Sequence, residues 1–115
     1  EVRQRIADVA AFVCMKAHAL NERLRDKDAY DVYFCLRVCA GGPAAVAERL
    51  RPLLGQPLVD EALDILGAKF AALDRVGPQW AARVAAAHGE DFDQVARDAL
   101  ERVGVLLETL GRRRR

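Results

Sequence analysis

The chain has 115 residues, just over half of them apolar, and a formal net charge of +1 at pH 7. This length suits one domain with a modest core. So small a net charge excludes a general attraction to nucleic acid, and no apolar run approaches membrane-spanning length. Three cysteines, an odd number, argue against a disulfide scaffold, so we expect a reduced, cytoplasmic protein. Scarce aromatic residues beside abundant Ala and Leu predict an all-α domain.

Two helices are predicted in the first third of the chain. The first runs from about residue 2 to 24, because apolar residues recur at spacings of three and four. They form one stripe: Ile6, Val9, Val13, Ala17, Leu20 and Leu24. The second helix, from about residue 28 to 39, is apolar nearly all round, which is typical of a central helix. The charged link Arg25-Asp26-Lys27 joins them, and together they predict an antiparallel αα-hairpin.

Glycine and proline divide the rest of the chain into further helices. Helices are predicted over about 43–53, 57–76 and 80–88, with Gly77-Pro78 as a break before the last of these. The helix over 57–76 should bury Val59, Leu63, Leu66, Phe70 and Leu73. Asp91 or Asp93 caps a final helix that Gly111 stops. The sequence therefore predicts an all-α fold of five to six helices packed around a central αα-hairpin. It forms one domain over residues 1–111, followed by a basic tail over 112–115.

Charged residues interrupt the otherwise apolar hairpin. Lys16 and Arg23 lie two turns apart beside the stripe of the first helix, and Asp28 and Asp31 open the second. An unpaired buried charge is costly, so Asp31 should lie near Lys16 or Arg23. One interpretation is structural: Asp28 as N-cap, Asp31 favouring the helix dipole, and both basic side chains extending into water. The other is a site where an ammonium group meets phosphate oxygens, as phosphoryl transfer requires.

The pattern K-x6-R-x3-K-D-A-Y-D-V-Y-F, from Lys16 to Phe34, resembles the helical signature of AbiEii/AbiGii-type nucleotidyltransferases. These are toxins of bacterial toxin–antitoxin and abortive-infection systems, in the polymerase-β nucleotidyltransferase superfamily. The resemblance is strong over the hairpin and loose over the other helices. It implies that Lys16 and Asp31 are catalytic, and that Lys16, Arg23 and Asp28 contribute to nucleotide binding.

The catalytic half of that family carries a Gly-Ser turn and an Asp-x-Asp metal-binding pair, and this sequence has neither. We therefore interpret the chain as the C-terminal helical domain of such an enzyme, inactive by itself. The resemblance implies that the whole enzyme uses Mg²⁺ and an NTP, and transfers a nucleotide to an RNA such as tRNA or to a protein acceptor. Its partners would be the missing N-terminal nucleotidyltransferase domain and an antitoxin protein.

The alternative is a non-catalytic helical module that binds a protein partner. A helical domain that docks on another domain should expose an apolar patch, or cover it by forming a homo-oligomer.

Two further groups of residues have simple structural interpretations. Cys14 and His18 lie one turn apart on the first helix, as do Cys35 and Cys39 on the second, so an aligned hairpin could hold zinc. Their spacing matches no established zinc motif and Cys is often a small buried residue, so no metal ligand is assigned. The arginine run 112–115 could contact phosphates, or be a solvated tail.

Overall fold

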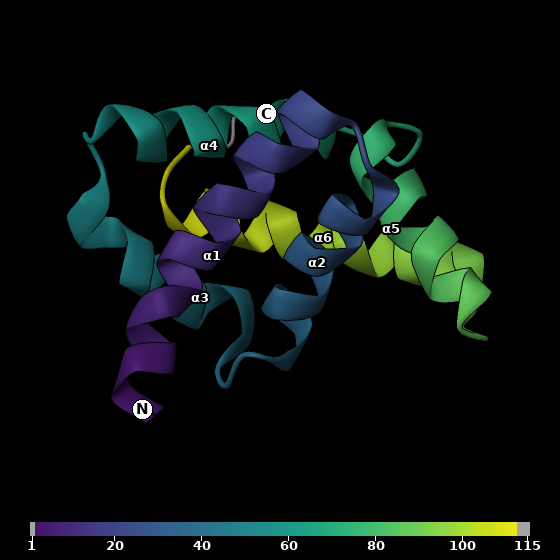
Figure 1. Ribbon diagram of the computed structural model, residues 1–115, viewed down its shortest axis with the longest axis horizontal. Coiled ribbons are helices and arrows are strands. Elements are labelled where there is room, and N and C mark those ends of the chain that lie inside the picture. Colours follow the sequence, from purple (N-terminus) through teal and green to yellow (C-terminus); the bar gives the residue numbers. More distant parts are fainter. Residues whose placement is uncertain (1, 113–115) are drawn as a thin grey trace.

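The computed structural model describes residues 2–112, with side chains from Val9 onward (Figure 1). Over this range the chain forms six α-helices and one short 3₁₀ helix, with no strand. They are α1 (Val2–Arg23), α2 (Asp26–Val38), α3 (Gly42–Leu50), η1 (Arg51–Leu53), α4 (Pro57–Lys69), α5 (Val76–Ala87) and α6 (Phe92–Thr109). The predicted all-α class is confirmed. None of the helices within residues 2–112 is both long and apolar enough to span a lipid bilayer.

Helix α2 lies at the centre of the fold, since it packs against α1, α3, α5 and α6. Its Val32, Tyr33 and Leu36 are almost completely buried, as its nearly uniform apolar surface predicts. Helix α1 lies antiparallel beside it and buries Val13 and Leu20, while α6 runs behind the hairpin (Figure 1). The polar side chains of the hairpin are therefore positioned by the two helices that the core holds in place.

The hairpin turn is shorter than the sequence predicts. Helix α2 begins at Asp26, so only Leu24 and Arg25 link the two helices, and Arg25 rather than Asp28 is the N-cap residue. The Asp28 amide donates to the Arg25 carbonyl at 3.1 Å, and the Asp28 carboxylate is free to face α1. Leu24, predicted to be part of the apolar stripe, is 59% exposed. It reverses the chain with a φ of 55°, a left-handed conformation that is uncommon outside glycine.

The connection between α4 and α5 also differs from the prediction. Helix α4 ends at Lys69 instead of near Val76, which leaves Leu73 in the connection and 38% exposed. Gly77 and Pro78 lie inside the first turn of α5, where proline is tolerated because its missing N–H would have no helical partner. A Cβ on Gly77 would lie 2.6 Å from Phe70 Cγ, so this glycine permits close packing and does not break a helix.

Both ends of the last helix are fixed by polar contacts. Of the two predicted caps Asp91 is the one used: its Oδ1 accepts a hydrogen bond from the Gln94 amide at 3.0 Å. Beyond the other end of the helix, the Arg112 guanidinium pairs with Asp64 of α4 at 2.7 Å. The remaining residues of the predicted basic tail, 113–115, lie outside the described part of the chain.

Candidate functional site

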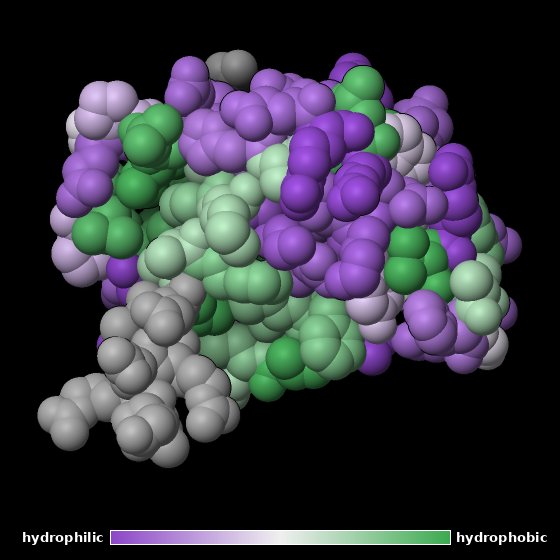
Figure 2. Space-filling view, in the orientation of Figure 1, coloured by the Kyte–Doolittle hydropathy of each residue, from purple (hydrophilic) through white to green (hydrophobic). Residues whose placement is uncertain are grey.

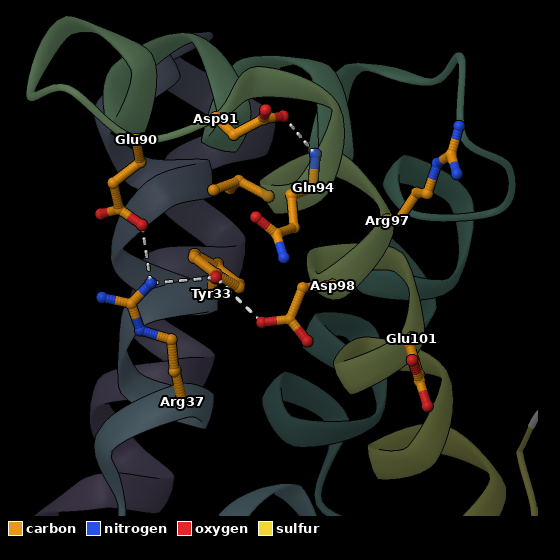
Figure 3. Close-up of a pocket in the computed structure, with 9 residues that line it drawn as sticks. Tyr33, Arg37, Glu90, Asp91, Gln94, Arg97, Asp98 and Glu101 are labelled. Atoms are coloured by element: carbon orange, nitrogen blue, oxygen red, sulfur yellow. Dashed lines mark hydrogen bonds and ion pairs between the residues drawn. The ribbon is translucent and has the colours of Figure 1, made fainter.

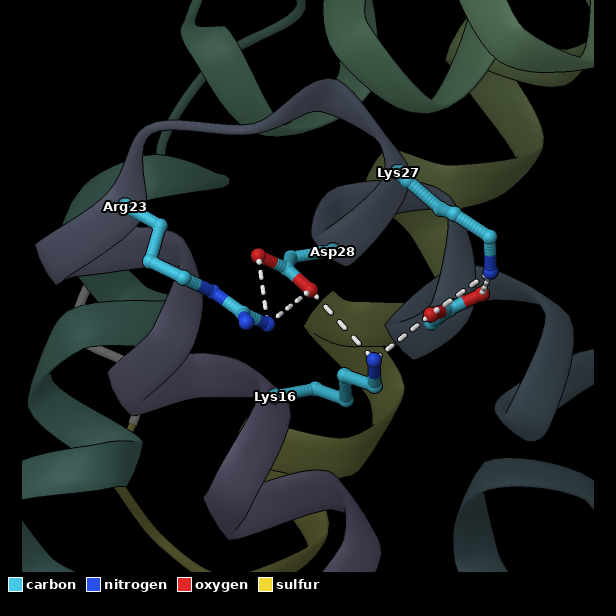
Figure 4. Close-up of polar contacts among 5 residues, drawn as sticks. Lys16, Arg23, Lys27 and Asp28 are labelled. Atoms are coloured by element: carbon cyan, nitrogen blue, oxygen red, sulfur yellow. Dashed lines mark hydrogen bonds and ion pairs between the residues drawn. The ribbon is translucent and has the colours of Figure 1, made fainter.

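Five charged side chains of α1 and α2 form an alternating row across the hairpin, which we call the charge row: Arg23, Asp28, Lys16, Asp31 and Lys27 (Figure 4). Lys16 Nζ lies 2.9 Å from Asp31 Oδ2 and 3.4 Å from Asp28 Oδ1. Arg23 Nη2 donates to both oxygens of Asp28 at 3.1 and 3.3 Å. Lys27 Nζ donates to both oxygens of Asp31 at 3.1 and 3.2 Å. The row therefore runs cation, carboxylate, cation, carboxylate, cation.

The carboxylates of the charge row lie beneath its cations. The side chains of Asp28 and Asp31 are 3% and 14% exposed, whereas those of Arg23 and Lys27 are 51% and 72% exposed. Lys16, in the middle, is 17% exposed. Three cations outnumber two carboxylates within the row, and its most exposed groups are positive, so the row presents cationic ends to solvent. Such a surface favours anions over cations.

Lys16 of α1 is held by two carboxylates of α2. Its hydrogen bond to Asp31, followed by the attraction of the Asp31 and Asp28 charges, raises the pKa of Lys16 above its usual value. The group is therefore a protonated ammonium at neutral pH and cannot act as a general base. It can place a fixed positive charge against an anion. Its Nζ also lies 5.6 Å from the centre of the Phe12 ring, a cation–π contact.

The structure brings together all four residues that the sequence selected, Lys16, Arg23, Asp28 and Asp31, and the predicted approach of Asp31 to Lys16 is confirmed. It also adds Lys27, which the sequence analysis treated as part of a linker. Once α2 is known to begin at Asp26, the i, i+4 spacing of Lys27 and Asp31 on one helix face indicates this pair.

The carboxylates of the charge row do not fit a magnesium site. Asp28 faces Lys16 and Arg23, and Asp31 faces Lys16 and Lys27, so each carboxylate already has two cationic neighbours. A divalent cation would be repelled by these groups and would have to displace them. The Mg²⁺ expected for a whole nucleotidyltransferase is therefore not assigned to Asp28 or Asp31.

The zinc arrangement considered from the sequence is not formed. Within the described residues no three His, Cys, Asp or Glu side chains are placed to hold a metal ion together. His18 turns towards α4, and its Nε2 lies 2.9 Å from the Leu58 carbonyl oxygen. The three cysteines are free thiols and partly buried.

A second polar region, a shallow cleft of about 490 Å³, lies between α2 and the start of α6 (Figure 3). The Tyr33 hydroxyl donates to Asp98 at 2.9 Å, and Arg37 donates to Tyr33 at 3.1 Å and to Glu90 at 3.0 Å. These groups are satisfied by one another, so the cleft serves to tie α2 to α6 and to the loop before it. No motif in the sequence indicated these contacts, because they join residues far apart in the chain.

Comparisons of the chain with known protein families, with curated proteins and with solved structures found no match.

Proposed function

We propose that this chain is the C-terminal helical domain of an AbiEii-like nucleotidyltransferase of toxin–antitoxin type, in which Lys16 contacts the triphosphate of an NTP. The observation that supports this most directly is the 2.9 Å contact between Lys16 and Asp31, on separate helices. A lysine with no role beyond a hydrated charge on the protein surface would extend its ammonium group into water. Lys16 is instead fixed between two carboxylates while part of its side chain remains exposed.

In this proposal the two residues have different roles. Lys16 stabilises negative charge on the reacting phosphates, an effect that depends on a preorganised charge in a partly dehydrated site. Asp31 orients the Lys16 ammonium and keeps it protonated. The chain contributes binding and charge stabilisation, and Mg²⁺ would be held by carboxylates of the proposed N-terminal domain. The acceptor is an RNA such as tRNA, or a protein. We expect the protein to act in the cytoplasm, where free thiols stay reduced.

The test is Lys16→Ala in a protein that includes the proposed N-terminal domain. Transfer of label from an α-labelled NTP to total RNA should fall about 100-fold or more, the usual cost of losing one preorganised transition-state contact. The fold should survive, because Arg23 still pairs with Asp28 and Lys27 with Asp31. The matched control is Lys69→Ala, because Lys69 is also a partly buried lysine on a helix, at the end of α4. This substitution should leave transfer unchanged.

Near-full transfer by Lys16→Ala, with an unchanged melting curve, would show that Lys16 is not a phosphate contact. The proposal would then be wrong at its central residue.

A second candidate function is a non-catalytic helical module that binds an antitoxin or another protein. It is favoured by apolar side chains that stay exposed on the hairpin helices: Phe12, Met15, Phe34 and Val38. Figure 2, in the orientation of Figure 1, shows an apolar area on the lower part of the visible surface, next to a hydrophilic area. Contiguous apolar surface of this kind often marks a protein contact.

The two candidates differ in what the apolar side chains do. If the chain is a binding module, Phe34→Ser should weaken a complex with a co-expressed antitoxin, while Lys16→Ala should not. Sedimentation velocity of each complex measures this, and also detects a homo-oligomer that uses the same surface.

A further inference from the structure

We propose that the exposed face of the hairpin binds an amphipathic helix of a partner protein, whose apolar side chains lie on an apolar strip and whose carboxylates lie over the charge row. The apolar strip consists of Phe12 and Met15 of α1 with Phe34 and Val38 of α2. This inference rests on the second candidate function and names the chemistry of its partner, an acidic helix of about three turns. It involves no nucleotide.

Exposed apolar side chains gather on the hairpin helices. Among the residues whose side chains the structure describes, eight large apolar residues are exposed, and four of them make up the apolar strip. The other four are spread over the hairpin turn, α4, the connection after it and α6: Leu24, Leu58, Leu73 and Val105. Single exposed apolar residues are ordinary on protein surfaces, whereas a group of neighbours marks a contact. The apolar strip therefore indicates a binding surface.

The apolar strip and the charge row form one continuous surface. Phe12 lies one turn before Lys16 on α1, and the Lys16 Nζ is 5.6 Å from the centre of its ring. Phe34 and Val38 lie three and seven residues after Asp31, so they share its face of α2. The 2.9 Å contact between Lys16 and Asp31 joins the two helices. The surface is thus charged near the hairpin turn and apolar away from it, in agreement with the adjoining areas of Figure 2.

The aromatic rings of the strip are held in place within the fold. The Phe34 ring stacks on Tyr30, with 5.7 Å between ring centres, and the Arg37 guanidinium carbon lies 5.6 Å from the Phe34 ring centre. Phe12 is held by Lys16 in a similar way. Aromatic side chains ordered before binding lose little entropy on contact, which suits anchors of a protein interface.

A helix is the element that fits this face. Helix α2 packs against α3, α5 and α6 on its other sides, and α1 packs against α3 and α4. Within residues 2–112 no helix covers the strip, whose side chains are 36% to 57% exposed. A third helix packs on two antiparallel helices by laying an apolar ridge between them. Lys27 and Val38 are 11 residues apart, about 16 Å along α2, so a partner helix of about three turns spans the row and the strip.

The charge of the partner follows from the charge row. Arg23 and Lys27 are more than half exposed, whereas Asp28 and Asp31 are largely buried beneath them. Interfaces place opposite charges against each other, so the partner carries Asp or Glu at the end that lies over the row. A second copy of this chain cannot cover row and strip together, because it would bring the cations against an identical row or against apolar side chains.

The test is a selection from a displayed library of helical peptides. Peptides of about 16 residues, with an alanine framework and randomised positions along one face, are selected on the 115-residue chain. The selected peptides should combine apolar residues at spacings of three and four with Asp or Glu near one end. Selection on Lys27→Glu should shift the charged positions towards Lys and Arg. Failure to enrich any peptide, or enrichment without carboxylates on the unchanged chain, would overturn the inference.

Matched variants show where the selected peptide binds. By fluorescence anisotropy, Phe34→Ser should weaken the peptide at least about tenfold and Lys27→Gln about threefold. The controls are Leu58→Ser, another exposed apolar residue, and Arg83→Gln, an exposed cation that pairs with Asp26 outside the row. Both should leave affinity unchanged, and equal losses from the controls would overturn the inference. The circular dichroism melt of each variant verifies that it is folded.

Two other occupants of the strip are detected directly. Sedimentation velocity would reveal a dimer that Phe34→Ser dissolves, and flotation with phosphatidylcholine–phosphatidylserine vesicles would reveal membrane binding that Phe34→Ser abolishes. Either result would overturn the inference. The inference and the second candidate function fail in different ways. Selected peptides that are apolar but not acidic would leave a binding module without this partner chemistry. Acidic peptides that bind the strip, with an antitoxin complex unaffected by Phe34→Ser, would do the opposite.

Discussion

Lys16 of α1 and Asp31 of α2 meet at 2.9 Å, and the same lysine reaches Asp28 at 3.4 Å, so one ammonium joins both carboxylates of the neighbouring helix. Arg23 and Lys27 extend this contact on either side. The hairpin is thus locked by charges along the edge where its two helices meet. These ion pairs can stabilise the hairpin and still leave a ligand site, because the carboxylates are buried and the ends of the cations face solvent.

Asp28→Asn should lower the free energy of unfolding by about 2 kcal/mol, because Arg23 and Lys16 lose the charge of a buried partner. Urea denaturation measures this. Asp26→Asn is the control: Asp26 is 37% exposed and pairs with Arg83 at 3.5 Å, so its replacement should cost at most about 0.5 kcal/mol. Equal effects of the two substitutions would mean that Asp28 contributes no more than a surface ion pair.

Two helical glycines should respond in opposite ways to alanine. A Cβ at Gly77 would lie 2.6 Å from Phe70 Cγ and 2.7 Å from the Lys69 carbonyl oxygen, so Gly77→Ala should destabilise the fold by about 2 kcal/mol. At Gly67 the nearest atom would be Leu107 Cδ1 at 3.9 Å, an ordinary contact. Gly67→Ala should therefore be neutral or stabilise by up to about 1 kcal/mol. Thermal melts compare them, and a melting temperature raised by Gly77→Ala would contradict the packing described for α5.

Asp91→Ala should cost about 1 kcal/mol, because the Gln94 amide loses its hydrogen-bond acceptor at the start of α6. Asp93→Ala, two residues further on, removes only a favourable charge in the first turn of the helix and should cost less, about 0.5 kcal/mol. Chemical denaturation of the two variants in parallel decides this. A larger loss of stability for Asp93→Ala than for Asp91→Ala would show that Asp91 is not the residue that caps α6.

The Cys35 thiol should react slowly with iodoacetamide. Burial, followed by the proximity of Cys39, raises the pKa of Cys35 to about 11 from a usual value of 9.0. At pH 8 its thiolate fraction is about 100-fold lower than that of a thiol with the usual pKa. A more basic thiolate is a better nucleophile, and this offsets about half of the loss in rate on a logarithmic scale. The net result is a rate about tenfold lower than in urea-unfolded protein, and still rising with pH above 9 in the folded state. Mass spectrometry of the alkylated peptides gives both rates, and a folded-state rate that levels off near pH 9 would contradict the raised pKa.

Local properties of the sequence determined the helices and part of the site. The spacing of Val13, Ala17 and Leu20 predicted the buried face of α1, since an amphipathic period needs only neighbouring residues. The costly burial of charge on an apolar helix predicted that Asp31 would meet Lys16. Both inferences depend on interactions within two helices that a short link holds together.

Tertiary packing decided the rest. Gly77 and Pro78 read as a break in the sequence, yet they lie in the first turn of α5, where the missing Cβ of Gly77 lets the helix pack closely against Phe70. Asp28 reads as a cap, yet it is buried under two cations that α1 supplies. The bond between Tyr33 and Asp98 joins α2 to α6 and has no local signal. In each case the deciding partner lies on another helix, and its distance is set by the core rather than by the residues beside it in the chain.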